Sequence, residues 1–310
     1  MNEPGQAGTG RLRVSLPGEE LAGALGDVSP RVELLRWDMA GPPPRDDIDL
    51  AVVPYLPGNE HLRWLEGVRT RLVQAQYLGY DGVAEALPPG HVYANARGVH
   101  ETSTAELALA LLLAAQRGIP DFVRAAGAPA GAPAWYPSLA DRRVMVLGHG
   151  GVGRAIEARL APFEVDLVRV ARTARDGVHG IAELPELLPA CEVVIVGVPL
   201  TEETERLVDA RFLAALPDGA IVVNVARGRV ADTASIVAEA RTGRLRFALD
   251  VTDPEPLPPG HELFRLPNVL ISPHAGGMSS AMLPRVARLV RRQIELLLTG
   301  AEPVNVVLRS

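Results

Sequence analysis

Residues 142–160 read RRVMVLGHGGVGRAIEARL, and this stretch decides the fold of the chain around it. An apolar strand is followed at once by Gly148, Gly150 and Gly153, and a helix begins among them. The first glycine permits a tight turn, the second lets a diphosphate approach the backbone, and the third lets helix and strand pack closely. The free N–H groups and the positive dipole end of the helix then attract phosphates. The sequence therefore predicts a dinucleotide site formed by Gly148, Gly150, Gly151, Val152 and Gly153.

Short apolar strands alternate with helical segments on both sides of this loop, which is typical of parallel sheets. From Asp141 onward six strands are predicted, near residues 143–147, 166–170, 192–197, 220–224, 246–250 and 268–271. Their rhythm matches a doubly wound dinucleotide-binding sheet. Four strands are predicted upstream, at residues 11–16, 49–53, 71–76 and 91–95. Residues 102–116 and 279–298 are predicted to be long helices, the second followed by an extended tail.

The end of the second cofactor strand distinguishes NADP from NAD. An NAD site usually places an Asp or Glu there, about 20 residues after the glycines, whereas this chain has Ala171, followed by Arg172, Thr173 and Arg175. Guanidinium and hydroxyl groups bind a 2′-phosphate, and no carboxylate repels it, so NADP(H) is favoured and NAD(H) is possible. A polar turn without a ligand remains the alternative. His149 is expected to be an exposed loop residue without a role.

Polar residues also follow three later strands. Arg227 comes at the end of one, Glu255 lies in the Pro-rich loop after Asp250, and His274 directly follows another. Because such sheets bind ligands at the carboxyl ends of their strands, we expect these side chains to converge. Together they suggest an anion-binding arginine and a histidine acid/base tuned by a glutamate. Strand-end caps or surface ion pairs are the alternative.

Composition excludes several classes of function. The chain has 31 arginines and no lysine, which rules out a P-loop lysine, a Schiff-base lysine and a lysine general base. The net charge of −6 argues against a nucleic-acid surface. The first residues lack the apolar core of a signal peptide, and the longest apolar stretch, residues 107–115, is too short to span a bilayer. We expect a cytoplasmic protein without nucleic-acid, membrane or metal partners.

These motifs together resemble the D-isomer-specific 2-hydroxyacid dehydrogenases, a family that includes glyoxylate/hydroxypyruvate reductases and phosphoglycerate dehydrogenases. The matching segments are LGYDGV at 78–83, NARGVHETSTAE at 95–106, GHGGVG at 148–153, VPLTEET at 198–204, VNVARG at 223–228, LDVTDPEPLP at 249–258 and SPH at 272–274. The resemblance implies an α/β fold with two doubly wound parallel-sheet domains. A Rossmann cofactor domain, residues 102–282, would be inserted into a flavodoxin-like substrate domain of residues 1–101 and 283–310. It also implies a homodimer.

The resemblance further implies roles for individual residues. Arg227 would bind the substrate's carboxylate and carbonyl, His274 would protonate the carbonyl oxygen, and Glu255 would hold the imidazole and raise its pKa. The cofactor would also contact Val198, Pro199, Val225 and Asp250. The substrate carboxylate would be seated by backbone amides of Leu78 and Gly79. A glycine common after the cofactor helix is Glu164 here, which we expect to be a variation of the turn.

The leading interpretation is therefore an oxidoreductase that transfers hydride between NADP(H) and a small 2-hydroxy acid or 2-keto acid, such as glyoxylate or hydroxypyruvate. Two alternatives remain at this point. One is a non-catalytic dinucleotide-sensing scaffold of the same fold, similar to the C-terminal-binding corepressors. The other is a biosynthetic dehydrogenase that acts on a larger 2-hydroxy acid.

Overall fold

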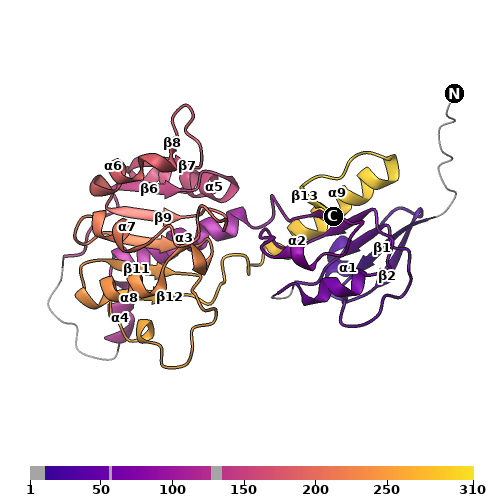
Figure 1. Cartoon of the computed structure of the whole chain (residues 1–310), viewed down its shortest axis with the longest axis horizontal. Helices are drawn as coiled ribbons and strands as arrows, with labels where there is room; N and C mark the ends of the chain where they lie inside the picture. The colour runs from indigo at the N-terminus through magenta and orange to yellow at the C-terminus, as the bar shows by residue number, and fades with distance from the viewer. Residues whose placement is uncertain (1–10, 56–57, 127–134) are drawn as a thin grey trace. The chain divides into compact units, whose positions relative to one another are not determined.

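The chain folds into two compact units. The computed structural model describes residues 11–55, 58–126 and 135–310. One unit consists of residues up to His100 together with Ser280–Ser310, and the other of Glu101–Ser279 (Figure 1). Residues 1–10, which the sequence assigned to a substrate domain, lie outside the described residues.

The second unit is built on a seven-stranded parallel sheet in the order β12-β11-β10-β9-β6-β7-β8. Its strands are β6 (Arg143–Leu147), β7 (Asp166–Ala171), β8 (His179–Gly180), β9 (Val193–Val196), β10 (Ile221–Asn224), β11 (Arg246–Leu249) and β12 (Val269–Ile271). The strand order reverses between β6 and β9, which is the ligand-binding switch point of such sheets. The six predicted strands and the Rossmann-type sheet are confirmed. The two-residue β8 is an addition that the sequence did not predict.

Helices cover both faces of this sheet. One face carries α3 (Glu101–Gln116) and α5 (Gly151–Leu160), whose apolar side chains pack with β6, β9 and β10. The other carries α6 (Leu184–Leu187), α7 (Ala210–Ala215) and α8 (Thr233–Thr242). The remaining elements of the unit are α4 (Ile119–Arg124) and the 3-10 turns η2 (Ala161–Phe163), η3 (Ile181–Glu183), η4 (Leu188–Ala190), η5 (Gly228–Val230) and η6 (Glu262–Phe264).

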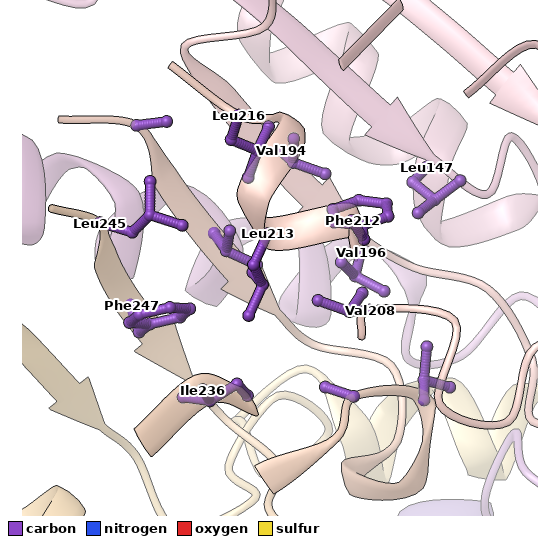
Figure 2. Close-up of a cluster of buried hydrophobic side chains, with 14 of the residues drawn as sticks. Leu147, Val194, Val196, Val208, Phe212, Leu213, Leu216, Ile236, Leu245 and Phe247 are labelled. Atoms are coloured by element: carbon purple, nitrogen blue, oxygen red, sulfur yellow. The ribbon is translucent and has the colours of Figure 1, made fainter. Parts of the chain in front are cut away.

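Buried side chains between β9 and α7 show how the helices α6, α7 and α8 pack on their face of the sheet. Figure 2 shows Phe212 and Leu213 of α7 beside Val194 and Val196 of β9. All four side chains are buried, and each buried side chain of this size contributes roughly 1.5–3 kcal/mol. The Asp209 carboxylate accepts a hydrogen bond from the Phe212 N–H at 2.8 Å and so caps the N-terminus of α7.

The first unit has a six-stranded sheet in the order β13-β5-β4-β3-β1-β2. Its strands are β1 (Leu12–Leu16), β2 (Val32–Arg36), β3 (Leu50–Val52), β4 (Leu72–Gln74), β5 (Val92–Ala94) and β13 (Val306–Arg309). The order β2-β1-β3-β4-β5 is the flavodoxin-like one. The helical elements are α1 (Glu19–Leu25), η1 (Glu60–Leu65), α2 (Val83–Ala86) and α9 (Met282–Thr299). Helices α1 and α9 cover one face, while η1 and α2 cover the other.

Two edge strands of this sheet were not predicted as strands. In β2 only the first residue, Val32, is buried, so its sequence lacks the apolar run of a central strand. The chain's last strand, β13, was predicted only as an extended tail. It pairs antiparallel with β5, and the half-buried side chains of β13 carry little periodic signal.

Glu164 adopts a left-handed backbone conformation at the end of η2, with φ 57° and ψ 41°. The residue's backbone carbonyl accepts the N–H of Asp141, which fixes the turn before β6. A side chain with a Cβ pays about 1–2 kcal/mol for this conformation, whereas glycine adopts it freely. The turn at Glu164 therefore forms although its residue is not glycine.

Glu164→Gly is expected to raise the melting temperature of the second unit by about 1–3 °C, because the relief of left-handed strain exceeds the added entropy of the unfolded chain. Differential scanning calorimetry measures the shift. Arg265→Gly is the control in the same unit, since Arg265 is exposed with φ −106° and glycine there relieves no left-handed strain. A lower melting temperature for Glu164→Gly would contradict the assignment of strain.

Candidate active site

The glycine loop between β6 and α5 has the close contacts that its sequence predicts. Gly148 has φ 106°, and a Cβ on it would lie 2.6 Å from the backbone of Gly197. A Cβ on Gly153 would lie 2.0 Å from the carbonyl oxygen of Gly148. A Cβ on Gly150, in contrast, would meet no described atom within 4 Å. The first and third glycines are thus required by packing, while the second leaves open space above the loop.

The start of α5 presents donors to this open space. The first intrahelical hydrogen bond runs from Arg154 N–H to the Gly150 carbonyl at 3.0 Å, so the N–H groups of residues 151–153 precede the helical ladder. No side chain of the described residues caps this end. A Cβ on Gly151 would lie 3.0 Å from the Glu101 side chain, a tight contact that glycine avoids. The loop therefore fits a dinucleotide diphosphate.

Three cationic or hydroxyl side chains, those of Arg172, Thr173 and Arg175, follow the end of β7 at Ala171. All three residues are exposed. Arg175 is held by reciprocal backbone hydrogen bonds with Val178, of 2.9 and 2.8 Å. Its guanidinium donates to the carbonyl oxygen of His149 at 3.1 Å and contacts that residue's Nδ1 at 3.2 Å.

The expectation for His149 is wrong. Its side chain is only 10% exposed, and its Nε2 lies 2.6 Å from the carboxylate of Glu157 on α5. The sequence signal was available but weak: Glu157 lies eight residues after His149, about two helical turns into α5. Local spacing did not reveal that the ring folds back along the helix.

His274 and Glu255 form a hydrogen-bonded pair. His274 Nδ1 lies 2.5 Å from Glu255 Oε1, and both side chains remain partly exposed. The hydrogen bond and charge of Glu255 raise the pKa of His274 above its usual value, although partial burial and the charge of Arg227 oppose this. Burial alone would raise the pKa of Glu255, but its bond to His274 and the charge of Arg227 lower it. Arg227 therefore lies within electrostatic reach of both partners.

Asp250 anchors the loop that carries His274. This carboxylate, 3% exposed, accepts hydrogen bonds from Ser272 Oγ at 2.6 Å, from Ala275 N–H at 2.8 Å and from Gly276 N–H at 2.9 Å. The backbone carbonyl of Asp250 accepts the His274 N–H at 2.8 Å. These bonds hold His274 at φ 53°, a left-handed conformation that a non-glycine residue adopts only when its surroundings impose it. The sequence did not predict this anchoring role.

Arg227 is half-buried just after β10. The Asn224 side chain fixes its turn, because its Nδ2 donates to the Arg227 carbonyl at 3.1 Å and its Oδ1 accepts the Ala226 N–H at 3.0 Å. Gly228 lies directly against the loop after β11, where a Cβ would come within 1.8 Å of the Thr252 carbonyl. The loop of Arg227 is thereby packed on the loop that leads to Glu255.

The other predicted site residues lie in two different places. Val198 and Val225 are buried beyond the ends of β9 and β10, and Pro199 is exposed beside Val198. Leu78 and Gly79 belong to the first unit, where the Leu78 carbonyl accepts the Asn95 side-chain amide at 2.8 Å. Both are half-buried.

Two features are absent from the described part of the chain. Within it, no group of three or more His, Cys, Asp or Glu side chains is arranged to hold a metal ion. Nor does any helix there combine the length and apolar character needed to cross a membrane.

Similar proteins match most of this chain. Residues 109–276, a little over half of it, match the family model for the NAD-binding domain of D-isomer-specific 2-hydroxyacid dehydrogenases. The chain is 32% identical over 259 residues to a glyoxylate reductase of Pyrococcus horikoshii, covering 78% of this chain and 77% of that protein.

Two solved structures are similar over nearly their whole length. A D-isomer-specific 2-hydroxyacid dehydrogenase from Xanthobacter autotrophicus Py2, in complex with NADPH and MES, has a TM-score of 0.83 at 29% identity, covering 97% of this chain and 99% of that chain. An NADPH-dependent glyoxylate/hydroxypyruvate reductase from Sinorhizobium meliloti, in complex with NADP and malonate, has a TM-score of 0.77 at 26% identity, covering 96% and 97%.

His274 is expected to titrate above the ordinary histidine pKa of about 6.5, and Glu255→Gln to lower its pKa, because the amide removes the negative charge that favours the imidazolium. NMR titration of the His274 ring resonances measures both values. Glu262→Gln, which breaks the exposed Arg241–Glu262 pair, is the control and should leave the His274 pKa unchanged. An equal pKa in the wild type and Glu255→Gln would rule out the electrostatic coupling.

Proposed function

Because this chain belongs to the D-isomer-specific 2-hydroxyacid dehydrogenase family, we propose that it reduces a small 2-keto acid, such as glyoxylate or hydroxypyruvate, with NADPH as its preferred hydride donor. Its reaction class is hydride transfer between a nicotinamide dinucleotide and a 2-keto or 2-hydroxy acid. The observation that carries the proposal is the 2.5 Å pair of His274 and Glu255 within electrostatic reach of Arg227. The family's chemistry needs such an acid beside such a cation.

His274 is the proposed proton donor. Its Nδ1 is engaged by Glu255, so its Nε2–H is the group that remains to donate to the carbonyl oxygen of the substrate. The raised pKa keeps the imidazole protonated to a higher pH than an unperturbed histidine, and the protonated ring is the state that reduction requires. In the oxidative direction the neutral imidazole takes the hydroxyl proton back at Nε2. A nicotinamide dinucleotide, when bound, would supply the hydride for the carbonyl carbon.

Arg227 is the proposed substrate anchor. A guanidinium presents two parallel N–H donors, which match a carboxylate or a carboxylate oxygen together with the adjacent carbonyl oxygen. Its charge also opposes protonation of His274, which makes the imidazolium a stronger acid than Glu255 alone would leave it. Leu78 and Gly79 are the proposed source of backbone N–H groups for the substrate carboxylate.

The cofactor is assigned to the second unit, which we take as the cofactor domain, and the first unit to the substrate. The glycine loop would hold the diphosphate, and Arg172, Thr173 and Arg175 the 2′-phosphate. Val198, Pro199, Val225 and Asp250 would contact the nicotinamide side. The Asp250 carboxylate oxygen Oδ2 accepts one loop hydrogen bond and so keeps a lone pair for a carboxamide donor.

A homodimer is proposed through the cofactor domain. Large apolar side chains are exposed on and near α4, where a second copy could cover them, namely Ile119, Phe122, Val123 and Trp135. Such a surface supports self-association, as resemblance to the family also implies.

NADPH-dependent reduction of glyoxylate or hydroxypyruvate is expected, and Arg227→Ala should lower kcat/KM by about 10²–10³-fold, the usual loss of one donor to a developing negative charge. Spectrophotometric turnover with a panel of 2-keto acids measures this, and NADPH fluorescence should show unchanged dinucleotide affinity. Arg229→Ala, an exposed arginine paired with Glu205, is the matched control and should stay within about twofold.

Different results would contradict the anchor role of Arg227 and the reductase activity. Near-normal turnover by Arg227→Ala removes this residue from the anchor role. The absence of turnover with every keto acid and either cofactor contradicts the reductase and favours the dinucleotide-sensing scaffold.

Ala171→Asp combined with Arg172→Ala should shift the ratio of kcat/KM values from NADPH toward NADH by at least about tenfold. A carboxylate there repels a 2′-phosphate and accepts the ribose hydroxyls, while a charge-assisted hydrogen bond worth about 1.5–3 kcal/mol is lost. Steady-state kinetics with both cofactors measure the ratio. An unchanged ratio would show that these positions do not meet the 2′-position.

A further inference from the structure

Four side chains form a continuous chain of hydrogen bonds along the glycine loop. Arg169 of β7 donates from Nε and Nη2 to Glu157 Oε1, each at 2.6 Å. The other oxygen of Glu157 lies 2.6 Å from His149 Nε2. The Nδ1 of His149 lies 3.2 Å from Nη2 of Arg175, and the same Nη2 donates to the His149 carbonyl at 3.1 Å. These hydrogen bonds therefore join the strand β7, the helix α5 and the loops that follow β6 and β7.

The partners on the two sides of the His149 ring determine which tautomer makes both hydrogen bonds. A guanidinium has only N–H donors, so Nδ1 of His149 must accept from Arg175. The ring proton is then on Nε2, where it is donated to the Glu157 carboxylate. Burial opposes ionisation of Glu157, but the hydrogen bonds from His149 and Arg169 lower its pKa and keep it an acceptor. The tautomer of His149 with its proton on Nε2 satisfies both ring contacts at once.

This series of hydrogen bonds is anchored at its Arg169–Glu157 end. Arg169 and Glu157 are both partly buried on regular secondary structure, so the ring of His149 is fixed from the scaffold side. Arg175, by contrast, is an exposed residue of a turn, and among the described residues its guanidinium contacts only His149. Without this contact its long side chain would sample many rotamers in solvent.

We propose that His149, oriented by Glu157, is a positioning residue that holds the Arg175 guanidinium ready for the 2′-phosphate of NADP. This inference rests on the proposed NADP preference and names the residues behind it. His149 acts through Arg175 and does not itself bind the phosphate. Ordering a side chain before binding removes the entropy that binding would otherwise cost, which is typically a several-fold gain in affinity for one long side chain. The benefit applies only to ligands that carry the 2′-phosphate.

Two small ligands isolate this effect. Adenosine 2′,5′-diphosphate and 5′-AMP share the adenosine 5′-phosphate and differ in the 2′-phosphate alone. Isothermal titration calorimetry should show that His149→Phe, which keeps the bulk and removes the acceptor, weakens adenosine 2′,5′-diphosphate about three- to tenfold. Binding of 5′-AMP should stay within about twofold. His149→Asn, whose amide oxygen can accept from Arg175, should restore most of the loss.

A double variant separates positioning from a general structural role. Arg175→Ala should weaken adenosine 2′,5′-diphosphate by at least about tenfold, as expected for a lost charge-assisted hydrogen bond. His149→Phe should add nothing further to Arg175→Ala, because its effect passes through that arginine. Glu157→Gln should reproduce a part of the His149→Phe loss, and Glu262→Gln, on an unrelated ion pair of the same unit, should reproduce none of it.

The contrary outcomes are distinguishable. If Arg175→Ala weakens adenosine 2′,5′-diphosphate while His149→Phe leaves it unchanged, weakens both ligands equally or adds fully in the double variant, the positioning role is overturned and the NADP assignment stands. If Arg175→Ala leaves the affinity for adenosine 2′,5′-diphosphate unchanged, the assignment of Arg175 to the 2′-phosphate fails, and the positioning role fails with it.

Discussion

Hydrogen bonds to the buried carboxylate of Asp250 fix the loop that carries His274, the proposed acid/base. Three donors from residues 272–276 converge on this carboxylate, and the backbone carbonyl of Asp250 binds the His274 N–H. A buried carboxylate must have such partners, since leaving it unsatisfied would cost several kcal/mol. With these bonds in place His274 has a left-handed backbone conformation, and its Nδ1 lies 2.5 Å from Glu255. The position of His274, the proposed proton donor, is thus set by the hydrogen bonds of Asp250.

Two charged residues in the loops after β10 and β11 act on the pKa of His274. Glu255 raises the pKa of the imidazole, and Arg227 lowers it. Gly228 brings the arginine's loop into direct contact with the loop before Glu255, and any larger residue there would separate the two. Close packing between two loops is therefore what makes the opposing charges act on one ring. The glycine loop of the cofactor site depends on the same kind of constraint, since Gly153 rests on the Gly148 carbonyl.

Sequence patterns predicted the parts of the molecule that follow local rules. Central strands such as β9 and β10 are continuous apolar runs, and the glycine loop has a fixed spacing, so both could be recognised in one sequence. The edge strand β2 could not, because pairing with β1 and not its own pattern makes it a strand. His149 was misjudged and the anchoring role of Asp250 missed for a related reason. Their partners, Glu157, Arg175 and the loop after β12, are fixed by tertiary folding, and periodicity carries no information about such contacts.

The central claim is that a protonated His274, sustained by Glu255, delivers the proton during reduction of a 2-keto acid. The most direct measurement is the pH dependence of kcat/KM for NADPH-dependent glyoxylate reduction by the wild-type protein. We expect a plateau at low pH and a tenfold fall per pH unit above a pKa higher than 6.5, the direction in which Glu255 moves the pKa of His274. A rate that is constant up to pH 9, or that rises as the histidine deprotonates, would contradict this claim.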